Sequence, residues 1–377
     1  MAQSLVADAE QGGGLPIWGV ANDDSCVMVG DPSTPIISSV YAFGGTSFDA
    51  RSALASMVRG ANDPLTHSRL CSERPGLSEY LKRGYIPRVA DDEGLNGAAA
   101  VTLEDTSADF SISQFAASLG DKQDAETFLK RSANWRNLFD AETRYIRPRD
   151  LSGNFLSGFS AAKSDGFVEG NSAQYTWMVP YDLHGVIFAV GGANVANSRL
   201  DQYFSEYGRW NEQGRATGMG YSPHFFIGNE PSFGNPWIYN WTGEPWRTQE
   251  VVRKTLQDIF SASPGGLPGN DDLGATSAWA VFAQLGFYPE IPGVGGVTVN
   301  SPMFPSATLL LGDHRLQIRA DGAPGKLYVQ GISLDGQPVQ NWWIKWEKLK
   351  HANTLEFTLS GQSNHQPGEA PPSFSPE

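Results

Sequence analysis

The sequence is poor in cysteine, in long apolar runs and in positive charge. Its two cysteines, Cys26 and Cys71, are too few for a disulfide framework and lack the spacing of a metal site, and whether they pair with each other is open. No run of about 18 apolar residues is present to cross a bilayer. Residues 1–15 have neither the basic start nor the apolar stretch of a signal peptide. The sequence therefore predicts no membrane span and by itself gives no cellular address.

Acidic residues outnumber basic ones, with 41 Asp and Glu against 27 Lys and Arg and a formal net charge of −14 at pH 7. A surface of this sign repels phosphate backbones, because proteins bind nucleic acid mainly through Lys and Arg. Nucleic acid is therefore not an expected partner. Aromatic residues make up 11% of the chain. Tyr and Trp offer flat faces on which sugar rings stack, although most aromatic side chains are expected in the core.

The 377 residues are enough for two domains. Up to residue 287 the apolar residues recur at helical spacing, which predicts a mainly α domain over 1–287. The predicted helices are Phe48–Arg59, Ser111–Leu119, Asp124–Phe139, Ala173–Phe188, Ser198–Tyr207, Thr248–Ser261 and Ala275–Leu285.

From residue 288 the pattern changes to short β-rich runs separated by Gly, Pro, Asn and Asp. The runs are Gly296–Asn300, Ala307–Leu311, Leu316–Ala320, Leu327–Ile332, Trp342–Trp346 and Thr354–Leu359. They predict a small antiparallel β-sandwich over 288–362. Residues 363–377 are rich in Pro, Ser and Gly, and we expect them to be disordered.

Polar residues gather in three loops of the helical half. In the first, Glu169 and Asn171 precede an aromatic-rich helix that begins near Gln174. Glu169 is interpreted either as a helix-capping residue or as a general acid. A general acid needs a raised pKa, so Phe167, Tyr175 and Trp177 would have to desolvate it.

The second loop contains Asn229 and Glu230, whose side-chain oxygens are of the kind that calcium binds, although Asn-Glu-Pro is also an ordinary turn. The third contains Asn270, Asp271 and Asp272 in front of a helix. One of these acids could activate water while the other orients it, and turn or N-cap chemistry explains them equally well. Two carboxylates opening helices among aromatic residues fit glycoside hydrolysis, but the spacing distinguishes neither acid from base nor inversion from retention.

The three loops together resemble glycoside hydrolase family 92. The resemblance runs from about Ser4 to about Ser360, and the order of its motifs is specific. They are Glu169-Gly-Asn171, Gln174-Tyr-Thr-Trp177, Gly228-Asn-Glu-Pro-Ser232, Tyr239-Asn-Trp241, Glu244-Pro-Trp246, Gly269-Asn-Asp-Asp272, Ser277-Ala-Trp279 and Leu285-Gly-Phe-Tyr-Pro289.

This resemblance implies a calcium-dependent, inverting exo-α-mannosidase that acts on terminal α-linked mannose of mannan or N-glycans. It implies an (α/α)6 barrel followed by small β-elements, and an extracellular parent protein. Carried onto this chain, Glu169 is the general acid, Asp272 the general base and Asn270 its assistant. Substrate-binding roles fall to Gln174, Trp177 and Asp271, and metal-binding roles to Asn229 and Glu230.

The chain departs from the family pattern at three places. Ile227-Gly228 stands where members that trim α-1,2-linked mannose carry His-Glu, Phe233-Gly234 stands where two His are usual, and Ala275 replaces a Gln. The linkage is therefore open. Family members also begin with a β-sandwich domain and the first part of the barrel, so we expect a parent about twice as long or a missing part supplied in trans. The alternative function is an inactive mannan-binding or scaffold protein of the same fold.

Overall fold

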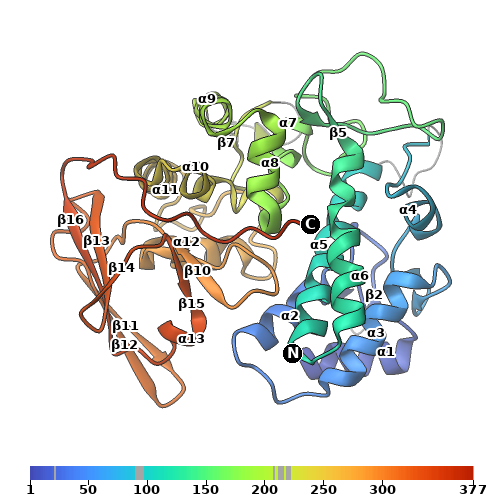
Figure 1. The fold of residues 1–377 in the computed structure, drawn as a ribbon, viewed down its shortest axis with the longest axis horizontal. Coiled ribbons are helices and arrows are strands. Elements are labelled where there is room, and N and C mark those ends of the chain that lie inside the picture. Colours follow the sequence, from blue (N-terminus) through green and yellow to red (C-terminus); the bar gives the residue numbers. More distant parts are fainter. Residues whose placement is uncertain (21–22, 90–96, 207–208, 211–215, 218–221, 377) are drawn as a thin grey trace. The chain divides into compact units, whose positions relative to one another are not determined.

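The computed structural model describes residues 1–20, 23–89, 97–206, 209–210, 216–217 and 222–376 (Figure 1). The chain forms two compact units. The first contains Met1–Asp182, Pro292–Val294 and Phe374–Glu377, and the second contains Leu183–Ile291 and Gly295–Ser373. This division falls inside the helical half of the sequence, whereas the sequence analysis expected a boundary at residue 287.

Helices dominate the first unit, with short two-stranded hairpins between them along the chain. The helices are α1 (Ala2–Gly12), α2 (Ser33–Ala42), α3 (Ala50–Asn62), α4 (Leu77–Arg83), α5 (Ala98–Ser118), α6 (Lys122–Ser132), η2 (Ala133–Leu138), α7 (Ser172–Tyr175) and η3 (Pro180–Asp182). The hairpins pair β1 (Gly19–Val20) with β2 (Asp23–Asp24), β3 (His67–Ser68) with β4 (Cys71–Ser72), and β5 (Phe139–Asp140) with β6 (Tyr145–Ile146).

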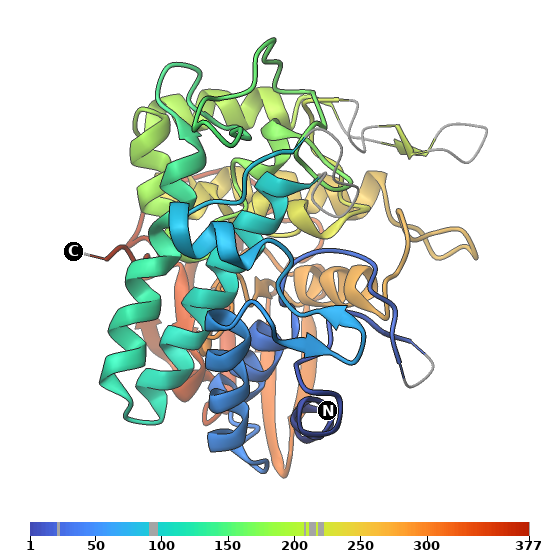
Figure 2. The same ribbon diagram turned by 90° about the vertical axis from the view of Figure 1, so that its right-hand side faces the viewer.

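Helix α5 is the core of the first unit. It is buried along most of its length and packs against α2, α3 and α6, with α6 beside it in both views (Figures 1 and 2). A helix buried on all sides has no single apolar stripe, so its periodicity is weak. This explains why the sequence predicted only its second half, over Ser111–Leu119. No helix in the described part of the chain combines the length and apolar character needed to cross a bilayer.

A buried ionic cluster fixes α5 to its neighbours. Arg74 donates from Nε and Nη2 to Asp31 Oδ2 at 3.1 and 2.9 Å, and from Nη1 to Asp109 Oδ1 at 2.8 Å. Arg131 of α6 donates to both oxygens of Asp109 at 2.7 Å. Buried charges are tolerated only when they are paired and hydrogen-bonded. Asp109 therefore joins α5 to α6 and, through Arg74, to the segments that precede α2 and α4.

Two further carboxyl groups of this cluster are held in a less polar setting. Burial raises the pKa of Glu73 to about 8 and the pKa of Asp105 to about 7. Neither oxygen of Asp105 has a hydrogen-bond partner among the described residues. For Asp109, burial acts in the same direction, but the charges of Arg131 and Arg74 outweigh it and lower the pKa. Glu73 and Asp105 therefore stay protonated at mildly acidic pH.

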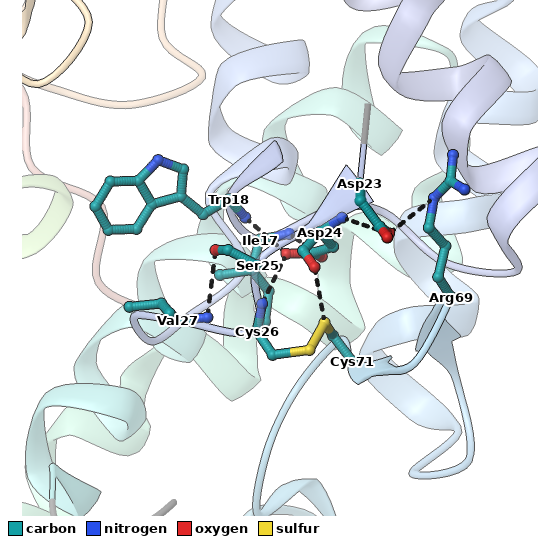
Figure 3. The surroundings of a disulfide bond; sticks show 9 residues. All are labelled: Ile17, Trp18, Asp23, Asp24, Ser25, Cys26, Val27, Arg69 and Cys71. Carbon is teal, nitrogen blue, oxygen red and sulfur yellow. Dashed lines mark hydrogen bonds and ion pairs between the residues drawn. A yellow bond between two sulfur atoms is a disulfide. The ribbon is translucent and has the colours of Figure 1, made fainter. Parts of the chain in front are cut away.

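Cys26 and Cys71 form a disulfide, which resolves the pairing that the sequence left open (Figure 3). It links the segment after β2 to strand β4. Two residues before Cys26, the carboxylate of Asp24 accepts hydrogen bonds from the backbone N–H groups of Ile17 and Trp18 at 2.9 and 3.2 Å. The covalent link and these hydrogen bonds together hold the first two hairpins.

The second unit combines helices with most of the strands. Its helices are α8 (Leu183–Val190), α9 (Ala193–Tyr203), η4 (Glu230–Ser232), η5 (Asn235–Trp237), α10 (Tyr239–Thr242), α11 (Pro245–Asp258), α12 (Ala275–Leu285) and α13 (Trp346–Leu349). Its strands are β7 (Arg209–Trp210), β8 (Ala216–Thr217), β9 (Phe287–Tyr288), β10 (Gly296–Val299), β11 (Ser306–Leu311), β12 (His314–Arg319), β13 (Tyr328–Leu334), β14 (Gln337–Val339), β15 (Trp343–Lys345) and β16 (Thr354–Ser360).

The strands after residue 286 form two sheets, in the orders β15-β10-β9 and β11-β12-β16-β13-β14. Each of the six β-rich runs predicted from the sequence overlaps a strand. The prediction of a purely antiparallel arrangement is wrong, because β12 and β16 pair in parallel. Parallel neighbours need a long connection, and here β13, β14, β15 and α13 lie between them in the chain.

Proline interrupts one predicted helix. The pattern over Ala173–Phe188 predicts a single helix, whereas α7 ends at Tyr175 and Pro180 begins the 3-10 turn before α8. Proline lacks the N–H that would continue the helix and clashes with the preceding turn. The helix predicted over Ala275–Leu285 has those bounds as α12. The helix predicted over Ser198–Tyr207 begins earlier, as α9, and Tyr207 itself lies outside the described residues.

The C-terminal segment corrects the expectation of disorder for 363–377, as far as residue 376. The backbone N–H of Trp342 donates to the carbonyl oxygen of Glu369 at 3.0 Å in the second unit. In the first unit the ring of Phe374 lies 5.2 Å from the ring of Phe110, measured between centroids. An aromatic residue inside a Pro- and Ser-rich stretch was the signal that this segment packs.

We predict that the folded chain loses stability as pH rises from about 5 to about 8. Unfolded carboxyl groups have pKa values near 4, whereas those of folded Glu73 and Asp105 are about 8 and 7. Between these values the folded state holds protons that the unfolded state has released, so the free energy of unfolding falls with pH. Thermal denaturation at both pH values measures this fall. The uncharged variant Glu73→Gln should show a smaller fall, and an equal one would contradict the assignment.

Candidate active site

Glu169 lies in a loop of the first unit that the N-terminus of α5 holds. The backbone N–H groups of Ala99 and Ala100 donate to the carbonyl oxygen of Gly166 at 2.9 and 3.2 Å. These N–H groups belong to the first turn of a helix, where no intrahelical acceptor is available. The buried cluster on Asp109 fixes the same helix, so the position of the Glu169 loop depends on the core.

A capping box follows Glu169 and begins α7, with Asn171 as the N-cap in place of Glu169, the cap that the sequence analysis had considered. The backbone N–H of Gln174 donates to Asn171 Oδ1 at 3.2 Å, and the backbone N–H of Asn171 donates to Gln174 Oε1 at 3.1 Å. The Tyr175 hydroxyl donates to the carbonyl oxygen of Val168 at 2.6 Å. These bonds brace the chain on both sides of Glu169, whose side chain is exposed.

The aromatic residues near Glu169 are buried in the first unit. Phe167, Tyr175 and Trp177 are 7%, 2% and 2% exposed. Because Glu169 is exposed, these rings support the loop and do not enclose its carboxyl group. The sequence analysis required them to desolvate this group if Glu169 is a general acid. Gln174 is also buried, with its side-chain oxygen used in the capping box. Substrate contacts of Gln174 and Trp177 stay predictions.

The other two loops lie against each other in the second unit. Gly228, next to Asn229, and Gly269, next to Asn270, are in such close backbone contact that no side chain fits at either. A Cβ built on Gly269 would lie 2.1 Å from the carbonyl oxygen of Gly228, and Gly269 has a φ of +64°. This contact brings the loop of Asn229 and Glu230 beside the loop of Asp271 and Asp272.

Asn229 is buried, and Glu230, the first residue of η4, is exposed. Within the part of the chain that the structure describes, no three His, Cys, Asp or Glu side chains are grouped to hold a metal. A cation at this loop would therefore need amide and backbone carbonyl oxygens, water or sugar hydroxyls beside Glu230. Calcium accepts such mixed oxygen shells, whereas most transition metals favour imidazole or thiolate. The donor set fits calcium.

The two adjacent acids of the third loop are in different settings. Asp271 Oδ1 accepts a hydrogen bond from the backbone N–H of Ser277 at 2.9 Å and another from its hydroxyl. The hydroxyl, followed by the N–H, lowers the pKa of Asp271. The side chain of Asp272 makes no hydrogen bond or ion pair with any described residue. Asp271 thus binds the first turn of α12, whose N-cap is Gly274, and Asp272 keeps a carboxylate without a partner among the described residues. Asn270 is exposed, and its carbonyl oxygen accepts from Thr276 Oγ1 at 3.0 Å.

Both proposed catalytic carboxylates stand on left-handed backbone. The φ angles are 48° for Glu169 and 43° for Asp272, and Leu273 follows with 58°. Residues with a Cβ rarely adopt this region, because it costs about 1–2 kcal/mol per residue. Such strain persists where the surrounding structure fixes it, and it clusters at functional sites. Glycoside hydrolysis uses a pair of carboxyl groups, and Glu169 and Asp272 are candidates for that pair.

Sequence reasoning missed Glu290, which is buried beside the second loop. A Cβ built on Gly234 would lie 2.0 Å from Glu290 Oε1, so this carboxyl group occupies the space that a side chain at 234 would need. Burial raises the pKa of Glu290 to about 8. Burial, and then the charges of Glu290 and Glu230, raises the pKa of Tyr288. The signal in the sequence was a single acid inside the apolar, proline-flanked stretch 287–292.

Comparison with known proteins places the chain among the glycoside hydrolases. The model of the glycosyl hydrolase family 92 catalytic domain matches residues 1–361. The chain therefore belongs to glycosyl hydrolase family 92, as the motifs of the sequence indicated.

Several relatives show how much of the family architecture the chain covers. An uncharacterized secreted glycosidase of Arthroderma benhamiae is 26% identical over 326 residues, which are 77% of this chain and 40% of that protein. A family 92 inverting mannosidase of Bacteroides thetaiotaomicron is 29% identical with a TM-score of 0.87, over 99% of this chain and 52% of its own. A family 92 α-mannosidase of the same organism is 30% identical with a TM-score of 0.87, and the match covers 100% of this chain and 49% of the α-mannosidase. The chain thus spans about half the length of these structures.

The contact between Gly228 and Gly269 gives a stability prediction. The variant Gly269→Ala should lower the free energy of unfolding by roughly 2 kcal/mol or more, because its Cβ meets backbone and its φ is left-handed. Gly274 is a matched control with a φ of +99° and nothing within 4 Å of a built Cβ. Gly274→Ala should cost only the conformational term of about 1 kcal/mol. Denaturant titration measures both, and equal losses would show that the close approach is unimportant.

Proposed function

We propose that this chain is the catalytic part of an exo-acting, inverting α-mannosidase that removes terminal α-linked mannose from mannan or N-glycans. The observation that carries the proposal is the match of the family 92 catalytic domain to residues 1–361, with Glu169 and Asp272 both on left-handed loop backbone. Membership of family 92 and the mannosidases among the similar structures support the choice of mannose. We further propose that the helices contribute to the (α/α)6 barrel implied by the family resemblance.

Glu169 acts as the general acid and protonates the glycosidic oxygen as the leaving group departs. Asp272 acts as the general base, removing a proton from the water that attacks the anomeric carbon from the opposite face, and Asn270 assists it. One attack from the opposite face inverts the configuration. Asp271 stays ionised, because the hydroxyl and N–H of Ser277 lower its pKa, and this contact holds the loop of the base in place. Contact with substrate is a second proposed role of Asp271.

Calcium completes the proposed site, with Asn229 and Glu230 among its ligands. When bound, it would help to hold and distort the mannose ring. The close approach of Gly228 to Gly269 supports this assignment, because it keeps the oxygen-bearing loop beside the loop of the base.

We propose that the linkage preference differs from that of members with a His-Glu pair. A Cβ on Gly228 would lie 2.4 Å from the ring of Phe226 and 2.9 Å from the backbone N of Gly269. The chain therefore has no room at this position for the Glu of that pair, and the substrate groups which that Glu would contact must be recognised differently or not at all.

Secretion of the parent protein is part of the proposal. The similar fungal protein is described as a secreted glycosidase, and the disulfide between Cys26 and Cys71 is of the kind that persists in oxidising compartments.

Leaving-group dependence tests the two catalytic roles. In the active enzyme, Glu169→Gln should slow hydrolysis of an alkyl α-mannoside by roughly 10²–10⁴-fold, because its leaving group needs protonation. An α-mannosyl fluoride needs none and should be hydrolysed at nearly the original rate. Asp272→Asn should slow both substrates, because both need activated water. Steady-state kcat/KM values measure these effects, and circular dichroism checks the fold.

Three outcomes would contradict this proposal. Equal losses on both substrates for Glu169→Gln would remove Glu169 as the acid. Retained activity in both variants would end the catalytic assignment of both loops. Absence of hydrolysis by the unsubstituted parent, together with retained mannan binding, would favour the inactive binding protein.

A structure with an inhibitor should place the two carboxyl groups about 6.5–9.5 Å apart, whereas about 5 Å would indicate retention.

Calcium dependence is tested by chelation. Removing calcium should abolish most α-mannoside hydrolysis, and adding it back should restore activity and raise the melting temperature, since a ligand that binds only the folded state stabilises it. Glu230→Gln should shift the calcium concentration for half-maximal stabilisation upward by about tenfold or more, because it removes a charged ligand. Glu356→Gln, an exposed acid on β16, is the control and should change nothing. A melting temperature indifferent to calcium would contradict the site.

A further inference from the structure

A polar cleft lies on the β-rich part of the second unit, away in sequence from the catalytic loops. Its volume is about 180 Å³. It is lined by residues of β13, of β14 and of the segment 340–342 after it, and by Asn364, Gln366 and Gly368 of the segment 363–377, which the sequence predicted to be disordered. Its polar lining consists of side-chain amides, from Gln330, Gln340, Asn341, Asn364 and Gln366. No charged residue is among the described residues that line it.

The walls of the cleft are fixed by hydrogen bonds. The backbone N–H of Glu369 donates to the carbonyl oxygen of Gln340 at 3.1 Å, and the N–H of Trp342 donates back to the carbonyl oxygen of Glu369 at 3.0 Å. The indole N–H of Trp342 donates to the carbonyl oxygen of Pro367 at 2.7 Å. The returning segment is thus held against β14 by main-chain and side-chain bonds, and the cleft exists before any ligand arrives.

The cleft also has unused hydrogen-bonding capacity and open space. Asn341 Oδ1 is buried and has no donor among the described residues. The register of β13 shifts between Val329 and Gly331, so Gln330 stands at an irregularity of the strand. A Cβ built on Gly331 would meet nothing within 4 Å. The cleft therefore offers room beside Gly331, next to the strand irregularity at Gln330, which a polar ligand could use.

We propose that this cleft is a noncatalytic binding site for neutral sugar residues. Each amide carries both a donor and an acceptor, which matches adjacent hydroxyl groups on a sugar ring. A charged ligand would lose its hydration without gaining a counter-charge, which disfavours ions. Val329, Ile332 and Val339 also line the cleft, but Val329 and Ile332 are buried, so the contact with a ligand falls to the amide-bearing residues. The site would hold a polysaccharide while the catalytic loops act on its end.

Hydrogen exchange followed by mass spectrometry tests the proposal at the site itself. The probe is soluble α-mannan, a choice that rests on the proposed function, with soluble β-glucan as a second neutral polysaccharide. At least one of them should slow exchange in the peptides that contain residues 328–342 and 361–369. Gly331→Leu places its Cβ in open space at the cleft, and it should remove this protection and weaken binding at least about tenfold, or 1.4 kcal/mol.

Gly361→Leu is the matched control, because its built Cβ also meets nothing within 4 Å and it does not line the cleft. It should bind as the unsubstituted chain does. Hydrolysis of a small aryl α-mannoside should be the same in both variants. This assay reports on the catalytic loops and hydrogen exchange reports on the cleft, so failure of the catalytic proposal is distinguished from failure of the binding proposal. If Gly331→Leu does not fold, the double variant Gln340→Ala, Gln366→Ala, at two exposed positions, takes its place. Absence of protection by both probes, or protection unchanged in the cleft variants, would overturn the proposal.

Discussion

The buried guanidinium of Arg74 is the constraint on which the helical unit depends. It has no access to water, so its charge is tolerated only because Asp31 and Asp109 are aligned on it. That requirement fixes α5 in position and in rotation about its axis. The N-terminus of the same helix then holds the Gly166 carbonyl, three residues before Glu169. A candidate catalytic loop with an exposed acid is therefore positioned by a buried ionic core, through a single helix.

Close approaches of glycine play the corresponding part in the second unit, and they give a physical reason for departures from the family pattern. Gly228 has no side chain because the backbone of Gly269 passes beside it, and Gly234 has none because the carboxyl group of Glu290 fills that space. A His-Glu pair before Asn229, or a His at 234, would require these neighbours to move. The glycines at 228 and 234 thus fit the local packing of this chain. We therefore expect these departures from the family pattern to change substrate recognition and to leave the fold intact.

The sequence predicted what depends on local chemistry and missed what depends on tertiary burial. The helix over Ala275–Leu285 and the six β-rich runs have periodic apolar residues and clear turn signals. The first half of α5 has none, because a helix enclosed on all sides can carry Ala, Thr and Asp on every face. Glu290 escaped for a related reason, since a lone acid in an apolar stretch indicates a buried carboxyl only once its neighbours are known. The packed end of the chain was hidden by its composition, which is typical of disordered segments.

The adjacent acids of the third loop show how the structure separates two residues that sequence reasoning left equivalent. Turn chemistry and catalysis were competing interpretations of Asp271 and Asp272; the structure shows the contact with the helix start for Asp271, and catalysis by Asp272 stays a proposal. Ser277 binds Asp271 and lowers its pKa, which commits that carboxylate to the start of α12. With the cap supplied, Asp272 is left without a partner in the described part of the chain, on a backbone that it would not adopt alone. A general base needs this combination, because a carboxylate already engaged in hydrogen bonds to the protein is a weaker acceptor for the proton of water.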